Sequence, residues 1–245
     1  MKADELRRFA AEEVAGDDAI VPAGLGTHAD VGGRARGRVV LAPAGVVEHV
    51  PAEMVVRVRA GTPLAELDAA LAPAGQRVRL EHGATVGGAI AVGAGRNEVL
   101  EITAVLADGK LVKVGGPVVK NVTGYDLCRL FVGSLGTLAV FVEAVLRTRP
   151  VPAAARWFAL PDPAVANRLW RPAAIRGGAV LLEGHPDDVA AQARDLGLVE
   201  RDEPAPDPLD WRPLVATDAV RAVHERVKHE FDPTGRLSPG RALWN

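Results

Sequence analysis

The stretch that decides the fold prediction is VVKNVTGYDLCRLFVGSLGTLAVFVEAVLR, residues 118–147. It holds a polar turn at 120–126 and a glycine turn at 133–137, and then an almost wholly apolar run from Leu138 to Leu146 that predicts a strand buried on both faces. Glu143 interrupts this run and is expected to have a partner, because an unpaired buried carboxylate is costly. Two interpretations stay open here: a site for a large flat ligand, or a sheet core with ordinary turns.

Composition narrows the class of protein. The chain has 245 residues, of which 48% are hydrophobic and 24% charged, as in a folded globular protein of one large or two small domains. A net charge of −2 and the absence of long basic runs argue against nucleic-acid binding. The single cysteine, Cys128, excludes an internal disulfide and favours a reducing compartment. The N-terminus predicts a charged amphipathic helix and not a signal peptide, and no uncharged run is long enough to insert in a membrane.

The first 150 residues predict strands mixed with a few helices. The second helix is expected to have Thr62 as its N-cap and Pro63 at its first position, with Leu64, Leu67 and Leu71 buried. The strands predicted at 99–106 and 111–114 are joined by Asp108-Gly109, a turn that favours a hairpin. The predicted helices are 3–15 and 63–72, and the predicted strands are 19–21, 38–42, 54–60, 76–80, 99–106 and 111–114.

From Pro150 onward the chain becomes rich in proline, alanine and arginine. This change predicts a boundary near residue 150 and a small second domain. Within it we expect a strand at 179–183 and a helix at 187–196, followed at 201–213 by a proline-containing linker or surface loop. A last helix is expected at 219–231, with Val220, Val223 and Val227 on its buried face.

The first glycine loop matches a well-known fingerprint without its context. Gly24, Gly26 and Ala29 satisfy G-x-G-x-x-[GA], which in a Rossmann unit is followed by a helix. Here ADVGGRARG follows, so we reject the Rossmann interpretation. The loop can still bind phosphate, because successive backbone N–H groups in a glycine turn form an anion-binding concavity.

Four motifs occur in a characteristic order: PAGLGTH (22–28), GATVGG (83–88), KNVTGYDLCRLFVGSLGTL (120–138) and FDPTGRLSPGR (231–241). Together they resemble the FAD-binding subunits, the E subunits, of glycolate oxidases. More broadly, they are similar to flavoproteins whose FAD domain is of the p-cresol methylhydroxylase or vanillyl-alcohol oxidase type. The resemblance covers residues 20–150 closely and the last fifteen or so loosely.

The resemblance implies an α+β fold, in which a two-subdomain PCMH-type FAD-binding domain is joined to a small α/β cap. The domains implied are 1–150 for FAD, 151–217 for the cap, and 218–245 for a helix and tail that return to the FAD domain. The first loop would wrap the diphosphate of FAD, and the second cluster would follow the diphosphate and the flavin edge, with the Thr85 hydroxyl as a donor. Residues of the third motif would shape the pocket wall, and the buried strand would run near the adenosine end. The cofactor-binding residues implied are Ala23, Gly24, Leu25, Gly26, Thr27, His28, Gly83, Ala84, Thr85, Val86, Gly87, Gly88, Gly93, Gly124, Tyr125, Val140 and Glu143.

The resemblance also implies an activity and partners. These are oxidation of glycolate or another small 2-hydroxy acid, beside a homologous larger FAD subunit and an iron–sulfur subunit. A cytoplasmic location is implied, with membrane association only through partner subunits. Two departures matter: only residues 94–98 connect the second motif to the next strand, where relatives have a longer segment near the flavin ring, and Ser238 stands where relatives often have Asn.

The candidate catalytic groups do not form a recognisable constellation. His224 and His229 are five residues apart on a helix, so they cannot share a metal as histidines four apart do, and no metal site is predicted. Cys128 could anchor a flavin or be a small core residue, and Arg96 is the best candidate for gripping an anion. Three functions therefore stay open: an FAD-holding subunit, a self-sufficient small flavin oxidoreductase, and a flavin-free structural subunit. We favour the first, because the glycine loops are present while catalytic groups are few and the cap is short.

Overall fold

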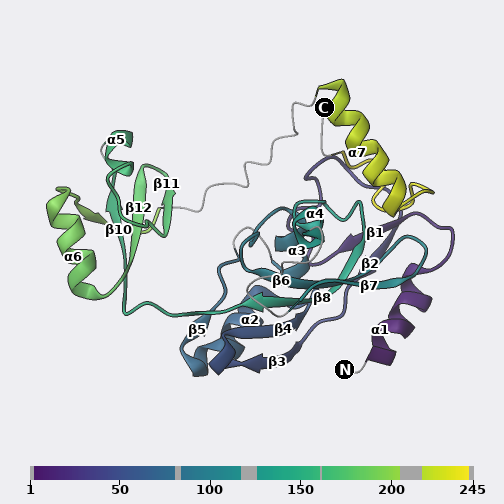
Figure 1. Cartoon of the computed structure of the whole chain (residues 1–245), viewed down its shortest axis with the longest axis horizontal. Coiled ribbons are helices and arrows are strands. Elements are labelled where there is room, and N and C mark those ends of the chain that lie inside the picture. The colour runs from purple at the N-terminus through teal and green to yellow at the C-terminus, as the bar shows by residue number, and fades with distance from the viewer. Residues whose placement is uncertain (1–2, 81–83, 117–125, 161, 205–216, 243–245) are drawn as a thin grey trace. The chain divides into compact units, whose positions relative to one another are not determined.

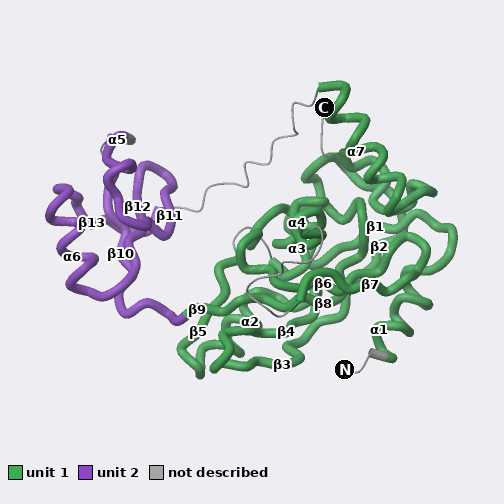
Figure 2. Tube along the Cα trace, in the orientation of Figure 1, with its two compact units in different colours: residues 1–149, 211–245 green, residues 150–210 purple. Residues whose placement is uncertain are grey.

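The computed structural model describes residues 3–80, 84–116, 126–160, 162–204 and 217–242. The chain divides into two compact units, one formed by residues 1–149 and 211–245, and the other by 150–210 (Figure 2). The second unit is therefore an insertion between two parts of the first. Each unit is described by itself below.

The first unit is built on a five-stranded antiparallel sheet in the order β3-β4-β8-β6-β7 (Figure 1). The predicted buried strand is confirmed as β8, which lies at the centre of this sheet and has seven buried residues followed by Arg147. The predicted hairpin is confirmed as β6 and β7, and its turn has Gly109 at φ +80° and the Lys110 amide bonded to Asp108. The strand bounds are Val46–Val50 (β3), Val55–Arg59 (β4), Val99–Val105 (β6), Leu111–Gly115 (β7) and Val140–Arg147 (β8).

One face of this sheet packs against three helices. They are α2, Leu64–Leu71, α3, Val86–Ala91, and α4, Leu127–Phe131. The predicted buried positions Leu67 and Leu71 of α2 are confirmed. Thr62, however, does not cap this helix: its side chain is fully buried, and its hydroxyl accepts a hydrogen bond from the Gly45 amide at 2.8 Å. Pro63 is the residue that precedes the first turn.

The other face packs against the N-terminal helix and a separate parallel pair of strands. The helix is α1, Ala3–Phe9, continued by a π turn over Ala10–Val14, and the pair is β1, Ile20–Ala23, with β2, Arg38–Leu41. Leu237 adds a parallel bridge to Ile20, so a segment from the end of the chain completes this layer. Three shorter elements of the first part of the chain are the 3-10 turns Pro51–Glu53 and Ala72–Ala74 and the strand β5, Gln76–Arg77.

The last helix, α7, covers Asp218–Phe231. Val227 and Phe231 pack against the main core, and the Phe231 ring lies 5.5 Å from that of Phe131. The predicted apolar stripe is wrong in its first half, because Val220 and Val223 are 43% and 55% exposed. The helix therefore contacts the core only through its final turns.

The second unit contains a four-stranded sheet in the order β11-β12-β10-β13. Phe158, Val180 and Leu182 of this sheet pack against Val189 and Ala193 of its longer helix. The predicted strand at 179–183 and helix at 187–196 are confirmed within one residue at each end. The bounds are Arg149–Pro150 (β9, at the junction), Ala154–Ala159 (β10), Pro163–Ala166 (α5), Ala174–Arg176 (β11), Ala179–Gly184 (β12), Pro186–Asp195 (α6) and Glu200–Arg201 (β13).

Candidate functional site

A cleft of about 650 Å³ in the first unit is lined by three stretches of chain and by two single residues further along the sequence. They are residues 21–30 from β1 and the first glycine loop, 34–41 around β2, 84–92 around α3, and a pair from the later chain, Leu135 and Arg241. A narrower extension of about 50 Å³ continues between Gly87, Ala139 and Phe141. This size is typical of a small-molecule or cofactor site.

The first glycine loop presents backbone donors that the protein itself does not use. Within the described part of the chain, the amides of residues 24–27 donate no hydrogen bond. The loop closes only beyond them, where Ala29 N–H donates to the Gly26 carbonyl at 3.2 Å and Val31 N–H to the His28 carbonyl at 3.2 Å. No helix follows, which confirms the rejection of the Rossmann interpretation. Four neighbouring N–H groups beside a cleft are suited to an anion.

The first and second glycine motifs meet at Gly24 and Thr85. A Cβ added to Gly24 would lie 2.3 Å from Thr85 Oγ1, which is far inside van der Waals contact. Thr85 is fixed in this place because its hydroxyl caps α3, accepting the Gly88 amide at 3.2 Å. Glycine at position 24 therefore lets the loop approach α3 closely.

The second motif supplies a wall rather than donors. The Val86 amide donates to the Thr62 carbonyl at 2.9 Å and the Gly87 amide to the Ala60 carbonyl at 2.7 Å. With Gly88 engaged by Thr85, the amides at the start of α3 are all occupied. These three amides are therefore not available to an anion, whereas Thr85, whose hydroxyl is the donor predicted from the sequence, lines the cleft.

The glycine turn at 133–137 packs on the end of α3. The Gly133 amide donates to the Ile90 carbonyl and the Leu135 amide to the Ala91 carbonyl, both at 2.9 Å. Leu135 adopts φ +55°, which is unusual for a bulky side chain and is typical of functional sites. This turn closes the floor of the cleft beside the first loop.

Comparison with known proteins shows what the first part of the chain is similar to. Residues 2–115 match the family described as "FAD binding domain". This first part of the chain is therefore similar to FAD-binding domains. The match covers both glycine motifs whose described residues line the cleft, and it confirms the resemblance found in the sequence.

Named relatives of this chain include oxidoreductases. The chain is 42% identical over 125 residues to glycolate oxidase subunit GlcE of Escherichia coli (strain K12), an alignment that covers 45% of this chain and 36% of that protein. It is 44% identical over 96 residues to D-lactate dehydrogenase of Archaeoglobus fulgidus, covering 35% of this chain and 22% of that one. It is also 47% identical over 60 residues to glycolate oxidase subunit GlcD of Bacillus subtilis (strain 168), covering 24% and 13%. The chain thus spans about a third or less of each relative's length.

Solved structures support the fold. An alkyldihydroxyacetonephosphate synthase superposes with a TM-score of 0.58 at 16% identity, covering 80% of this chain and 48% of that one. The mixed helix and sheet predicted from the sequence is confirmed as the fold of PCMH-type FAD-binding proteins. At this level of identity the likeness concerns the fold alone.

The residues predicted to bind the cofactor are divided between the cleft lining, the core and the part of the chain outside the described residues. Ala23, Gly24, Leu25, Gly26, Thr27, His28, Ala84, Thr85 and Gly88 line the cleft, and Gly87 lines its narrow extension. Val86, the first residue of α3, is fully buried in the core, and Gly93 follows α3 with its backbone facing Gly133. Gly83, Gly124 and Tyr125 lie outside the described residues.

The central strand reaches only the narrow extension of the cleft, and it does so through neither of the two residues predicted. Val140 is fully buried in the core on the α1 side of the sheet. Glu143 forms ion pairs with Arg57 at 2.8 Å and with Arg59 at 2.6 Å, which confirms the expected partner for this carboxylate but leaves it no role at the cleft wall. Burial acts to lower the pKa of Arg57, but its hydrogen bonds to Glu143 and Glu101 outweigh this effect and the pKa lies above its usual value. Phe141, between the two predicted positions, is the residue that lines the narrow extension.

Sequence reasoning missed part of the lining. Val39 and Leu41 on β2 are 59% and 63% exposed and face the cleft, as does Leu25, which is 69% exposed. Their alternation on a short strand was the available signal. Large exposed apolar side chains beside unused amides fit a ligand that joins an anion to flat rings, as FAD does. This chemistry of the lining agrees with the family match.

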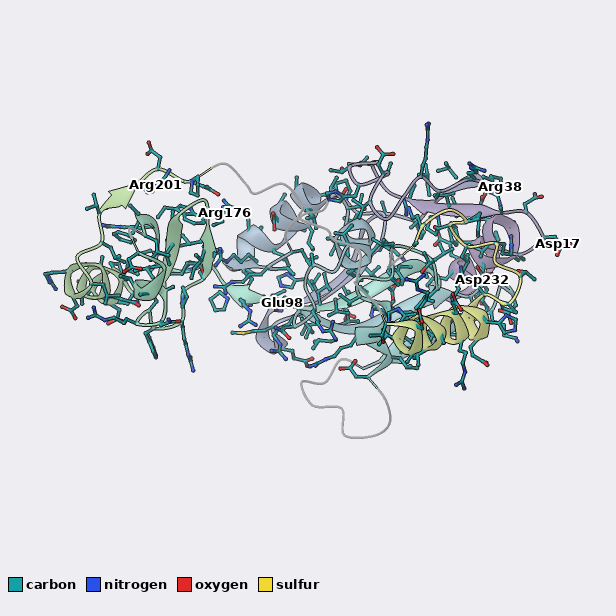
Figure 3. The ribbon with its side chains drawn as sticks, turned by 90° about the horizontal axis from the view of Figure 1, so that it is seen from above. Asp17, Arg38, Glu98, Arg176, Arg201 and Asp232 are labelled. Carbon is teal, nitrogen blue, oxygen red and sulfur yellow. The ribbon has the colours of Figure 1, made fainter. Side chains whose placement is uncertain are left out.

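The remaining candidates lie away from the cleft. Cys128 is buried under α4, with its thiol 3.4 Å from the Val114 carbonyl, and burial raises its pKa to about 11. Arg96 is exposed in the short turn before β6 and does not line the cleft. Glu98, labelled in Figure 3, lies at the end of that turn. It pairs with Arg149 at 3.0 Å. Among the described residues there is no cluster able to hold a metal, and no helix with the length and apolarity of a membrane span.

Proposed function

We propose that this chain is an FAD-holding subunit of a glycolate oxidase-like 2-hydroxy-acid oxidoreductase, acting beside a homologous larger flavin subunit. The observation that carries the proposal is the set of unused amides at residues 24–27, in a loop that lines a cleft together with the exposed apolar side chains of Leu25, Val39 and Leu41. The names of its relatives, glycolate oxidase subunits and D-lactate dehydrogenases, supply the substrate class.

In this proposal the first loop binds the diphosphate. Four successive N–H groups can each donate to a phosphate oxygen, and Gly24 and Gly26 allow the chain to approach it without a side chain in the way. Leu25, Val39 and Leu41 cover the apolar parts of the cofactor, and Ala84, Thr85, Gly87 and Gly88 form the opposite wall. When bound, FAD supplies a two-electron acceptor for oxidation of the hydroxy acid.

We assign the substrate chemistry to the larger subunit. Oxidation of a hydroxy acid requires a base for the hydroxyl proton and a cation for the carboxylate. Among the described residues, the ionisable groups that line the cleft are His28, Asp30, Arg34 and Arg241. These surround the proposed diphosphate end, so they are poorly placed to serve a substrate at the flavin ring. An iron–sulfur subunit that takes up the electrons is the third component of this proposal.

The experiment is flavin reconstitution followed by anaerobic reduction. The purified chain is titrated with FAD, and the flavin absorbance near 450 nm is followed while glycolate or D-lactate is added, first to the chain alone and then to the complex co-purified from its native source. We expect stoichiometric FAD binding, no bleaching of the lone chain, and bleaching in the complex. Rapid bleaching of the lone chain would favour a self-sufficient oxidoreductase, and failure to bind FAD would leave only a structural subunit.

A further inference from the structure

We propose that Arg241, from the far end of the chain, is the cation that neutralises the diphosphate of FAD in this cleft. The inference rests on the proposed function, in which the first glycine loop binds that diphosphate. It assigns a binding role to a side chain outside the glycine motifs, and it follows from the position, the hydrogen bonds and the charge environment of the guanidinium.

The position of Arg241 is central to the site. Arg241 lines both the main cleft and its narrow extension. One guanidinium nitrogen donates to the Ala29 carbonyl at 3.0 Å, where the first glycine loop ends, and the other to the Leu135 carbonyl at 3.0 Å, in the turn at the cleft floor. The side chain therefore spans the two backbone segments between which the cofactor is proposed to lie.

The Arg241 guanidinium has N–H donors that the described part of the protein does not use. It has five N–H donors, and the two carbonyls accept from only part of that set. Its Nε is buried and has no hydrogen-bond partner among the described residues. No carboxylate lies within ion-pairing distance of Arg241 in the described part of the chain. A cation that is bonded only to neutral carbonyls in a cleft calls for an anionic ligand.

The charge environment agrees with this geometry. Burial lowers the pKa of Arg241, and the more distant charge of Asp30 opposes the effect without cancelling it. The guanidinium remains protonated at all ordinary pH values. Binding of a diphosphate would thus compensate a charge that the folded protein leaves only weakly compensated.

A network of hydrogen bonds around Asp232 and Ser238 fixes the segment that leads to Arg241. The Asp232 carboxylate, at the end of α7, accepts the Arg236 amide at 3.0 Å and the Leu237 amide at 2.7 Å (Figure 3). Ser238 then donates its amide to the Ile20 carbonyl at 2.8 Å and its hydroxyl to the Gly136 carbonyl at 3.1 Å.

Beyond Ser238 the chain passes against the segment that follows the first glycine loop. Gly33 and Gly240 approach so closely that a Cβ on Gly33 would lie 2.7 Å from the Gly240 carbonyl oxygen. The hydrogen-bond network and this close approach fix the backbone just before Arg241, and the Ala242 amide, which donates to the Gly32 carbonyl at 2.7 Å, fixes it just after. A preorganised side chain loses little entropy when the ligand binds.

The test compares FAD affinity at low and high salt for three variants. Arg241→Met removes the charge and keeps the aliphatic part of the side chain. Arg241→Lys keeps the charge and loses the planar guanidinium. Arg36→Met is the control. Arg36 is exposed and does not line the cleft, although its backbone amide bonds to the Pro239 carbonyl nearby. Dissociation constants come from flavin fluorescence, and thermal midpoints are measured without FAD.

We expect Arg241→Met to weaken FAD binding about 10- to 100-fold at low salt, the effect of losing a charged hydrogen bond. High salt should weaken binding of the wild type and of Arg241→Lys, and should leave Arg241→Met nearly unchanged, because salt screens the charge that this variant lacks. Arg36→Met should bind as the wild type does.

Two results would overturn the inference alone: FAD affinity of Arg241→Met within about two-fold of the wild type, or a loss of affinity that is the same at every salt concentration. The second result would mean that Arg241 only ties two loops together. If Arg241→Met does not fold, Arg241→Lys and the salt dependence of the wild type decide the question. A wild type that binds no FAD overturns the proposed function and this inference with it.

Discussion

Replacing Gly24 by alanine tests how the first two glycine motifs fit together. The new Cβ would lie 2.3 Å from Thr85 Oγ1 and 2.9 Å from Thr85 Cγ2, so one of the two segments must move. Overpacking of this kind costs about 1–3 kcal/mol of folding free energy. If Thr85 turns away instead, α3 loses its N-cap, which costs about 1 kcal/mol. Either way the loop no longer sits where its amides face the cleft.

A double-mutant cycle separates the clash from other effects of Gly24→Ala. Thr85→Ala removes the two nearest atoms and leaves only Thr85 Cβ, at 3.1 Å from the new methyl group. We therefore expect Gly24→Ala to cost about 1–2 kcal/mol less in the Thr85→Ala background than in the wild type, a coupling typical of residues in contact. Urea unfolding of the FAD-free protein, followed by circular dichroism, measures each free energy.

FAD titration of the same four proteins gives the functional arm. Gly24→Ala should bind FAD much more weakly than the wild type, and the double variant should regain part of that affinity. Strict additivity of the two unfolding costs would refute the reasoning, because it would mean that Gly24 and Thr85 do not meet. So would a Gly24→Ala protein with unchanged stability and unchanged FAD affinity.

Three other changes probe the core of the first unit. Glu143→Ala should lower the free energy of unfolding by about 3–5 kcal/mol, because it removes the buried carboxylate that Arg57 and Arg59 share. Glu13→Ala, at an exposed ion pair of the same unit, should change it by less than about 1 kcal/mol. Equal effects would contradict the ion-pair argument. The pKa of Cys128 is raised from 9.0 to about 11, so the buried neutral thiol should stabilise the wild type relative to Cys128→Ala below pH 9. This difference in stability should shrink as the pH rises from 9 to 11. A difference that stays constant with pH would count against the raised pKa. Val223→Ser should leave the thermal midpoint within about 2 °C, as expected for an exposed position, while Phe231→Ala should lower it by several degrees; a large loss for Val223→Ser would show that this face of α7 is covered.

Much of the sheet could be predicted because its pattern is local. The run that becomes β8 is apolar at almost every position, and Asp108-Gly109 marks the hairpin turn, so each could be found without knowing its neighbours. The role of Thr62 could not, because it depends on Gly45, which the fold brings close from another segment. A Thr-Pro pair before an apolar stripe resembles a cap whether or not the hydroxyl is used elsewhere.

The cleft was predictable in outline and not in detail. The first glycine loop was found because glycine turns are visible in sequence, and the family match agrees with it. The use of the α3 amides was not visible, since Val86 and Gly87 donate to carbonyls of Thr62 and Ala60, more than twenty residues earlier. Glu143 shows the same limit: its need for a partner could be inferred, but not that two arginines of β4 would meet it and keep it from the cleft.

The hydrogen-bond network around Asp232 has a consequence for folding during translation. Arg236, within it, donates to the carbonyls of Val14, Asp18 and Ala107, so the N-terminal layer is completed by residues that leave the ribosome more than a hundred positions later. The inserted unit of residues 150–210 emerges in between and can fold first. A nascent chain paused before residue 232 would therefore have the glycine loops but no closed cradle around them, and we expect it to be sensitive to proteases and unable to retain flavin until translation passes that point.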